Sequence, residues 1–227
     1  VGSIFDETLK AAQEFTQKTG AVFIPPFDHM DVVLGQGTVG LEILEEHPEV
    51  DNILVCLGGG GLTAGVATAA KLLAKKNGRK VNVYAVQAEA AAAYPVSLEA
   101  GKPTTIKISP TIADGIAVAR PGKIPFDLIS EYVDKVVTVT EDEIARAMVV
   151  LMEKAKMVVE AGGAVGVAAI LAKKLKLKGT TAVILSGGNI DPLLLQRVIR
   201  HGLAASDRYT NIAVMLPDRP GQMVRKI

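Results

Sequence analysis

A run of five apolar residues, four consecutive glycines and an alanine-rich stretch, from Ile53 to about Asn77, constrains the fold of this chain more than any other feature. The apolar run is typical of a buried strand, and the residues after the glycines have the pattern of a helix. Glycine adopts backbone angles that are closed to other residues, so Gly58–Gly61 can turn several N–H groups toward one point. The N-terminus of the following helix adds partial positive charge. The stretch therefore predicts a cradle for a phosphate group, and the alternative is a flexible glycine-rich turn.

The rest of the chain alternates between helical and strand patterns. The strands are predicted at residues 21–24, 53–57, 81–86, 135–139 and 181–185, and the helices at 1–20, 31–46, 62–77, 126–132, 141–159, 163–178 and from 191 to about 201. Because the strands are apolar throughout rather than alternating, they predict a parallel sheet that is covered on both faces. Ligands of such sheets bind outside the carboxyl ends of the strands. Gly58–Gly61 and Ser186–Asn189 both follow strands, so we expect them to face one ligand.

The composition excludes several function classes. The 227 residues carry a net charge of +1, which gives no electrostatic reason to expect a nucleic acid or an anionic membrane as a partner. One cysteine cannot form an intrachain disulfide, and no apolar run is long enough to span a membrane. The three histidines show no metal-ligand spacing. These features predict a cytoplasmic protein.

Four segments resemble, in the same order, motifs of the fold-type II pyridoxal-phosphate (PLP) enzymes, the family of threonine dehydratase, serine racemase and serine dehydratase. They are Gly35–Glu42, Gly58–Gly61, Ile112–Val118 and Leu185–Asp191. The resemblance implies an α/β fold, a three-layer sandwich around a mostly parallel sheet, truncated at its N-terminus. It implies residues 1–20 as the last helix of a small domain and 21–210 as part of the large PLP-binding domain. Residues 211–227 resemble the first strand and turn of a truncated ACT-like regulatory domain, or else form a tail.

The resemblance also assigns a cofactor site. The implied cofactor-binding residues are Gly58, Gly59, Gly60, Gly61, Leu62, Gly115, Glu160, Ser186 and Gly187. The glycine loop would hold the phosphate of PLP, and Ser186 would hydrogen-bond the pyridine nitrogen, while Gly115 and Glu160 would lie near the ring. The residues by themselves also fit plainer interpretations: a turn serine, a loop glycine and a solvated carboxylate at a helix end. Cys56 is interpreted as a small buried hydrophobic residue.

Related enzymes can hold a cation beside this domain, and the matching positions here are Gln87, Ala91 and Ala93. In the related enzymes the site is built from a carboxylate, a carbonyl and a second carboxylate, so both carboxylates are missing here and no divalent metal site is predicted. Gln87 and Ala91 are only positional candidates, and the alternative is a monovalent ion held by carbonyls. The segment Gly35–Gly40 also fits the dinucleotide pattern G-x-G-x-x-G. No convincing strand precedes it, which argues against a dinucleotide site.

The family's segments that carry the Schiff-base lysine and hold the substrate carboxylate have no counterpart in these residues, so no catalytic residue is predicted. The resemblance implies that the complete enzyme deaminates L-threonine and L-serine to 2-oxobutanoate or pyruvate and ammonia by β-elimination, as a homo-oligomer. The chain alone is expected to be inactive. One alternative is a non-catalytic truncated α/β domain that self-associates and at most binds PLP or phosphate. Another is serine racemisation, against which the ACT-like tail and Gln87 argue.

Overall fold

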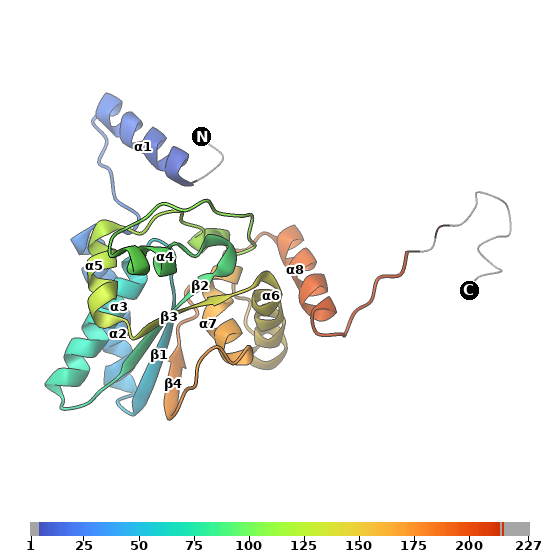
Figure 1. The fold of residues 1–227 in the computed structure, drawn as a ribbon. Coiled ribbons are helices and arrows are strands. Elements are labelled where there is room, and N and C mark those ends of the chain that lie inside the picture. Colours follow the sequence, from blue (N-terminus) through green and yellow to red (C-terminus); the bar gives the residue numbers. More distant parts are fainter. Residues whose placement is uncertain (1–4, 214, 216–227) are drawn as a thin grey trace.

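A four-stranded parallel sheet with the strand order β3-β2-β1-β4 forms the centre of the molecule (Figure 1). The structure is a computed structural model, and it describes residues 5–213 and 215. The strands are β1 (Val50–Cys56), β2 (Asn82–Ala88), β3 (Lys135–Val139) and β4 (Thr180–Val183). β1 lies between β2 and β4, so Ile53 pairs with Val83 on one side and with Ala182 on the other. The expected parallel sheet is confirmed.

Helices cover both faces of this sheet. One face is covered by α2 (Met30–Glu46), α3 (Gly61–Lys76) and α5 (Lys123–Tyr132), and the other by α6 (Glu141–Val150), α7 (Ala161–Leu171) and α8 (Pro192–Ala204). The short helices are η1 (Glu89–Ala91), α4 (Ala93–Ala100), η2 (Asp114–Ile116) and η3 (Leu151–Ala155). The helix α1 (Phe5–Thr19) lies outside the three layers in Figure 1. None of the described helices is long and apolar enough to cross a membrane.

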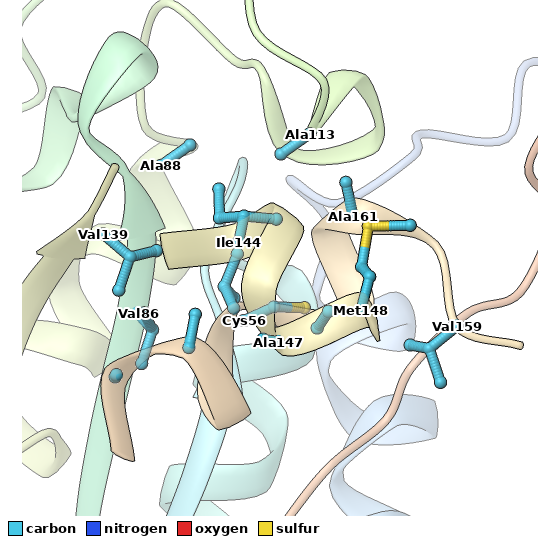
Figure 2. Packing of buried hydrophobic residues seen from close by; sticks show 14 of the residues in the cluster. Cys56, Val86, Ala88, Ala113, Val139, Ile144, Ala147, Met148, Val159 and Ala161 are labelled. Atoms are coloured by element: carbon cyan, nitrogen blue, oxygen red, sulfur yellow. The ribbon is translucent and has the colours of Figure 1, made fainter. Parts of the chain in front are cut away.

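Successive side chains of β1 point to opposite faces of the sheet, and both faces are buried, which explains why its apolar run is continuous. Ile53 and Val55 are buried against α3, whereas Leu54 and Cys56 face the cluster that α6 and α7 complete. Figure 2 shows this second cluster, with Cys56 beside Ala147 and Val86. A strand that is buried on both faces has no polar side to offer, which is why the sequence pattern predicted a covered parallel sheet. The three-layer α/β architecture is therefore confirmed.

Local capping fixes where several helices begin and end. The Thr140 hydroxyl accepts a hydrogen bond from the N–H of Glu143, whose carboxylate accepts one from the N–H of Thr140. The capping box that a threonine followed three residues later by a glutamate predicts from sequence is therefore present. Asp191 caps α8 through the N–H groups of its first turn. Gly20, at φ +72°, ends α1.

Four expectations for secondary structure were wrong in whole or in part. Residues 21–24 form no strand, and Val22 and Ile24 are exposed because no neighbouring strand pairs with them. The helix expected over 141–159 ends at Val150 and continues as the π-helical turn η3, and the helix expected to reach 178 ends at Leu171. Residues 211–213 and 215 carry no strand, and the rest of the predicted ACT-like strand and turn lies outside the described residues.

Candidate functional site: an anion cradle and a serine loop at the carboxyl end of the sheet

The tetraglycine loop Gly58–Gly61 connects β1 to α3 at the carboxyl end of the sheet. At each glycine, the space that a Cβ atom would need is already filled. A Cβ on Gly58 would lie 3.0 Å from the Cα of Ile116, and one on Gly61 would lie 3.0 Å from the Cα of Phe27. Gly60 has φ +106°, and a Cβ there would collide with the Tyr94 hydroxyl and lie 2.7 Å from Pro125. The four glycines are therefore required by close packing, which excludes the interpretation as a merely flexible turn.

The loop leaves backbone N–H groups free for a ligand. In the described part of the chain, the N–H groups of Gly58, Gly59 and Gly60 form no hydrogen bond. The first hydrogen bond inside α3 runs from the N–H of Ala64 to the carbonyl of Gly60 at 2.8 Å, so the N–H groups of residues 61–63 have no acceptor within the helix. These donors and the helix dipole favour an anion at this position. Leu62, the other expected residue of the cradle, lies in this first turn and is half-buried.

Ser186 lies three residues after the end of β4, the strand that neighbours β1 in the sheet. The N–H of Ile184 still donates to the carbonyl of Leu54 at 3.0 Å, so the two chains run side by side up to this point. The Oγ of Ser186 is 3.2 Å from the Sγ of Cys56, the last residue of β1. Ser186 is exposed, whereas Cys56 is buried. The serine hydroxyl thus lies at the carboxyl end of the sheet. It contacts Cys56, which precedes the first glycine of the cradle by two positions.

Glu160 holds residues 186–189, called the serine loop here, in place. Its backbone N–H donates to the carbonyl of Gly187 at 3.0 Å, and its Oε2 accepts a hydrogen bond from the N–H of Asn189 at 3.1 Å. Its Oε1 would lie 3.4 Å from a Cβ on Gly115. A Cβ on Gly187 would collide with the same carboxylate. Glu160 therefore fills the space between the 115 loop and the 187 loop.

The structure brings together the residues expected at the cofactor site. Gly58 lies against Ile116, the neighbour of Gly115, while Gly115 and Gly187 both lie against Glu160. Ser186 closes the arrangement by contacting the end of β1. Hydroxyl, thiol, carboxylate and backbone N–H groups are grouped here. Such a group of residues fits PLP, because it offers donors for a phosphate and a neutral hydroxyl for a ring nitrogen.

The cation candidates Gln87 and Ala91 are hydrogen-bonded to each other. The side chain of Gln87 is buried; its Nε2 donates to the carbonyl of Ala91 at 3.4 Å, and its Oε1 accepts from the N–H of Tyr94 at 3.0 Å. The Ala91 carbonyl that a cation would need therefore faces an amide N–H. Among the residues that the structure describes, no group of three or more His, Cys, Asp and Glu side chains could hold a metal ion.

Two ionisable groups behind the cradle are kept neutral. Burial raises the pKa of the Cys56 thiol, and the negative charge of Glu160 acts in the same direction. Burial, together with the charge of Asp28, raises the pKa of the Tyr94 hydroxyl. The Tyr94 hydroxyl donates to the carbonyl of Gly59 at 3.1 Å. The cradle is thus supported from behind by neutral hydrogen-bonding groups.

Several residues that shape the site were not predicted from the sequence. Phe27 fills the space that a Cβ atom on Gly59 or Gly61 would need, and Tyr94 supports the loop from α4. The two carboxylate oxygens of Asp28 accept the N–H groups of Lys123 and Ile124 at 3.0 and 2.9 Å and so cap α5. No local pattern connects residues that are about 95 positions apart, although the two prolines before Phe27 restrict the backbone of this loop.

Comparisons with known proteins agree with this geometry. The sequence profile of the family described as "Pyridoxal-phosphate dependent enzyme" matches residues 1–187. An L-threonine ammonia-lyase of Thermotoga maritima is 46% identical over 98% of this chain and 54% of its own length. The chain thus spans about half the length of the curated relatives that it matches.

Solved structures show the same relationship. The processed form of threonine deaminase isoform 2 from Solanum lycopersicum superposes with a TM-score of 0.80 at 34% identity, over 88% of this chain and 58% of that chain. A maize serine racemase superposes with a TM-score of 0.77 at 33% identity, over 90% of this chain and 63% of that chain. With the profile match, the cradle and the serine loop, these likenesses show that the chain belongs to the family of pyridoxal-phosphate-dependent enzymes.

Proposed function

We propose that this chain forms the cofactor-binding part of a lyase that deaminates L-threonine and L-serine, giving 2-oxobutanoate or pyruvate and ammonia. The observation that carries the proposal is the convergence of a donor-lined anion cradle and Ser186 at one edge of the sheet. The 46% identity to a protein named L-threonine ammonia-lyase supports this reaction over others of the family.

The described residues would divide the binding of PLP between them. The free N–H groups of the tetraglycine loop and the first turn of α3 would bind the phosphate. The Ser186 hydroxyl would hydrogen-bond the pyridine nitrogen without holding it protonated, as a carboxylate would. Glu160 would position the serine loop through Gly187 and Asn189. Bound PLP supplies the electron sink for removal of the α-proton and loss of the β-hydroxyl group.

Turnover is proposed to require residues beyond these 227. A PLP-dependent lyase needs a lysine that holds the cofactor and moves protons. The sequence contains no segment that resembles the family's lysine motif. We expect the isolated chain to form no 2-oxobutanoate from L-threonine, and formation of that product would contradict this part of the proposal.

The cradle is tested by comparing ligands with and without a phosphate. In isothermal titrations, PLP is expected to bind the chain at least about tenfold more tightly than pyridoxal, because charge-assisted hydrogen bonds to the phosphate are lost in pyridoxal. Inorganic phosphate is expected to compete with PLP. Gly59→Ala, which places a methyl group against Phe27, is expected to weaken PLP binding, whereas Gly35→Ala in open space on α2 is the control. Equal affinities for PLP and pyridoxal would contradict a phosphate cradle.

Racemisation of serine is the competing reaction, because a serine racemase shares this fold at 33% identity. Incubating L-serine with a longer protein that contains this chain separates the two reactions. Pyruvate and ammonia are the expected products. Accumulation of D-serine as the main product would replace the proposed lyase activity with racemisation.

We further propose that the chain forms the homo-oligomer predicted from its sequence. An apolar groove of about 440 Å³ lies between α2 and α3, and Met30, Leu34 and Leu72 on its rim are exposed. Exposed apolar side chains that gather in this way are typical of interaction surfaces. Sedimentation of Leu34→Glu is expected to show a smaller species than the wild-type chain, while Leu193→Glu on α8 serves as the control. Unchanged sedimentation of Leu34→Glu would contradict this surface.

A further inference from the structure

The side chain of Cys56 links the core of the sheet to Ser186. Cys56 is the last residue of β1 and is 8% exposed, among apolar neighbours that include Val86 and Ala147 (Figure 2). Its Sγ is 3.2 Å from the Oγ of Ser186, and the two residues are 130 positions apart in the chain. A purely apolar core residue would leave the serine hydroxyl without this partner. The contact therefore gives Cys56 a part in the site that its burial does not explain.

Either the Cys56 thiol or the Ser186 hydroxyl can donate in this hydrogen bond. The Cys56 carbonyl accepts the hydroxyl of Thr63 at 2.7 Å, so this end of β1 is fixed by a separate bond. Burial and the Glu160 carboxylate raise the pKa of Cys56, which keeps the thiol protonated, although the hydrogen bond with Ser186 acts in the opposite direction. The S–H group is a weak donor and sulfur is a weak acceptor, whereas the hydroxyl oxygen of serine accepts readily. An S–H that donates to Oγ leaves the hydroxyl hydrogen free for a ligand, whereas a hydroxyl that donates to Sγ does not.

We propose that Cys56 is a positioning residue whose thiol donates to the Oγ of Ser186 and thereby fixes the hydroxyl for donation away from the core. Such a hydroxyl is free to donate to an unprotonated ring nitrogen. This inference rests on the proposed function in one respect: the ring nitrogen belongs to PLP. The contact between thiol and hydroxyl itself belongs to the chain and exists without the cofactor.

The chain allows a direct test because it contains a single cysteine, so the infrared spectrum has a single S–H stretching band. Donation to Oγ lowers the frequency of this band. The band is therefore expected to shift to higher frequency in Ser186→Ala. Ser130→Ala is the matched control, because its hydroxyl donates to the Phe126 carbonyl on α5, far from Cys56, and should leave the band in place. An unchanged band in Ser186→Ala would overturn the proposed donation.

A second measurement separates positioning from mere packing. Cys56→Ala removes the donor, whereas Cys56→Ser restores a hydroxyl donor at the same place. PLP affinity is expected to fall about fivefold in Cys56→Ala, the size of one lost hydrogen bond, and to recover in Cys56→Ser. Equal affinities of wild type and Cys56→Ala would overturn the positioning role, as would equal losses in both variants. If the wild-type chain bound no PLP, the proposed function would fail, and the infrared comparison would still decide the inferred contact.

Discussion

The Glu160 carboxylate accepts a hydrogen bond from the backbone N–H of Asn189 at 3.1 Å, so the residue at the start of α7 holds a loop 29 positions further along the chain. The N–H of Glu160 also donates to the carbonyl of Gly187. The first contact depends on the side chain and the second does not. A substitution at Glu160 therefore weakens the serine loop without releasing it.

Replacing Glu160 by alanine is expected to loosen residues 186–189 and to lower the free energy of unfolding by about 1–2 kcal/mol, because the Asn189 N–H loses a charged acceptor. Hydrogen exchange measured by mass spectrometry should be faster in that loop alone. Glu42→Ala, at an exposed position on α2, provides the control. Unchanged exchange over 186–189 would show that Glu160 does not hold the loop.

Gly60 and Gly78 both have positive φ angles, +106° and +68°, but only Gly60 is enclosed. Alanine at Gly78 is expected to lower the free energy of unfolding by about 1 kcal/mol through backbone strain alone. Alanine at Gly60 should lower it by about 1–3 kcal/mol more, because the added methyl group meets Tyr94 and Pro125. Urea unfolding of the two variants measures the difference. Equal losses would mean that the loop can move away from Tyr94.

Alkaline pH is expected to destabilise the chain through its buried neutral acids. The folded state raises the pKa of Cys56 above its ordinary value of 9.0, so above pH 9 the unfolded chain loses a proton that the folded chain keeps. The stability that this group contributes is therefore fully present below pH 9 and is lost as the pH rises further. The free energy of unfolding, measured in urea from pH 8 to 11, should fall less steeply with pH in Cys56→Ala than in the wild-type chain. The two slopes are expected to differ by at most about 1.4 kcal/mol per pH unit. Parallel curves would contradict the raised pKa.

Asp28→Ala is expected to lower the free energy of unfolding by about 1–2 kcal/mol, because the N–H groups of Lys123 and Ile124 lose their acceptors at the start of α5. Asp31→Ala, three residues away and highly exposed, is the matched control. Thermal unfolding measures both variants. A loss in Asp31→Ala as large as that in Asp28→Ala would assign the effect to charge rather than to the cap.

The sequence predicted the parts of this molecule whose signals are local. The strand at 135–139 and the capping box at Thr140 were located at the correct residues, because the signal for each lies within a few consecutive residues. Four glycines in succession predicted a loop between β1 and α3 that leaves N–H groups free, and the structure has this loop, whereas phosphate binding stays a prediction. The residues expected at the cofactor site came from motif resemblance, and the structure brings them together.

Features set by packing between distant segments were missed. The helix after Glu141 changes to a π turn at Leu151, and α7 ends at Leu171 although the next residues, 172–178, contain no glycine or proline. Residues 21–24 have strand-forming side chains, but a strand needs a neighbour to pair with, and none is present among the described residues. The supporting roles of Phe27, Tyr94 and Asp28 depend on contacts across 32 to 96 positions, about which no window of sequence is informative.

The separation of 130 positions between Cys56 and Ser186 has a consequence for the order in which the site is assembled during translation. The ribosome delivers the N-terminal segments of a chain before the later ones. β1, α3 and β2 form contacts over about 30 positions, so the cradle has its nearest supports early. β4 and the serine loop can join only after a far longer loop is closed, which is slower. We therefore expect the anion-binding half of the site to form before the half that contains Ser186.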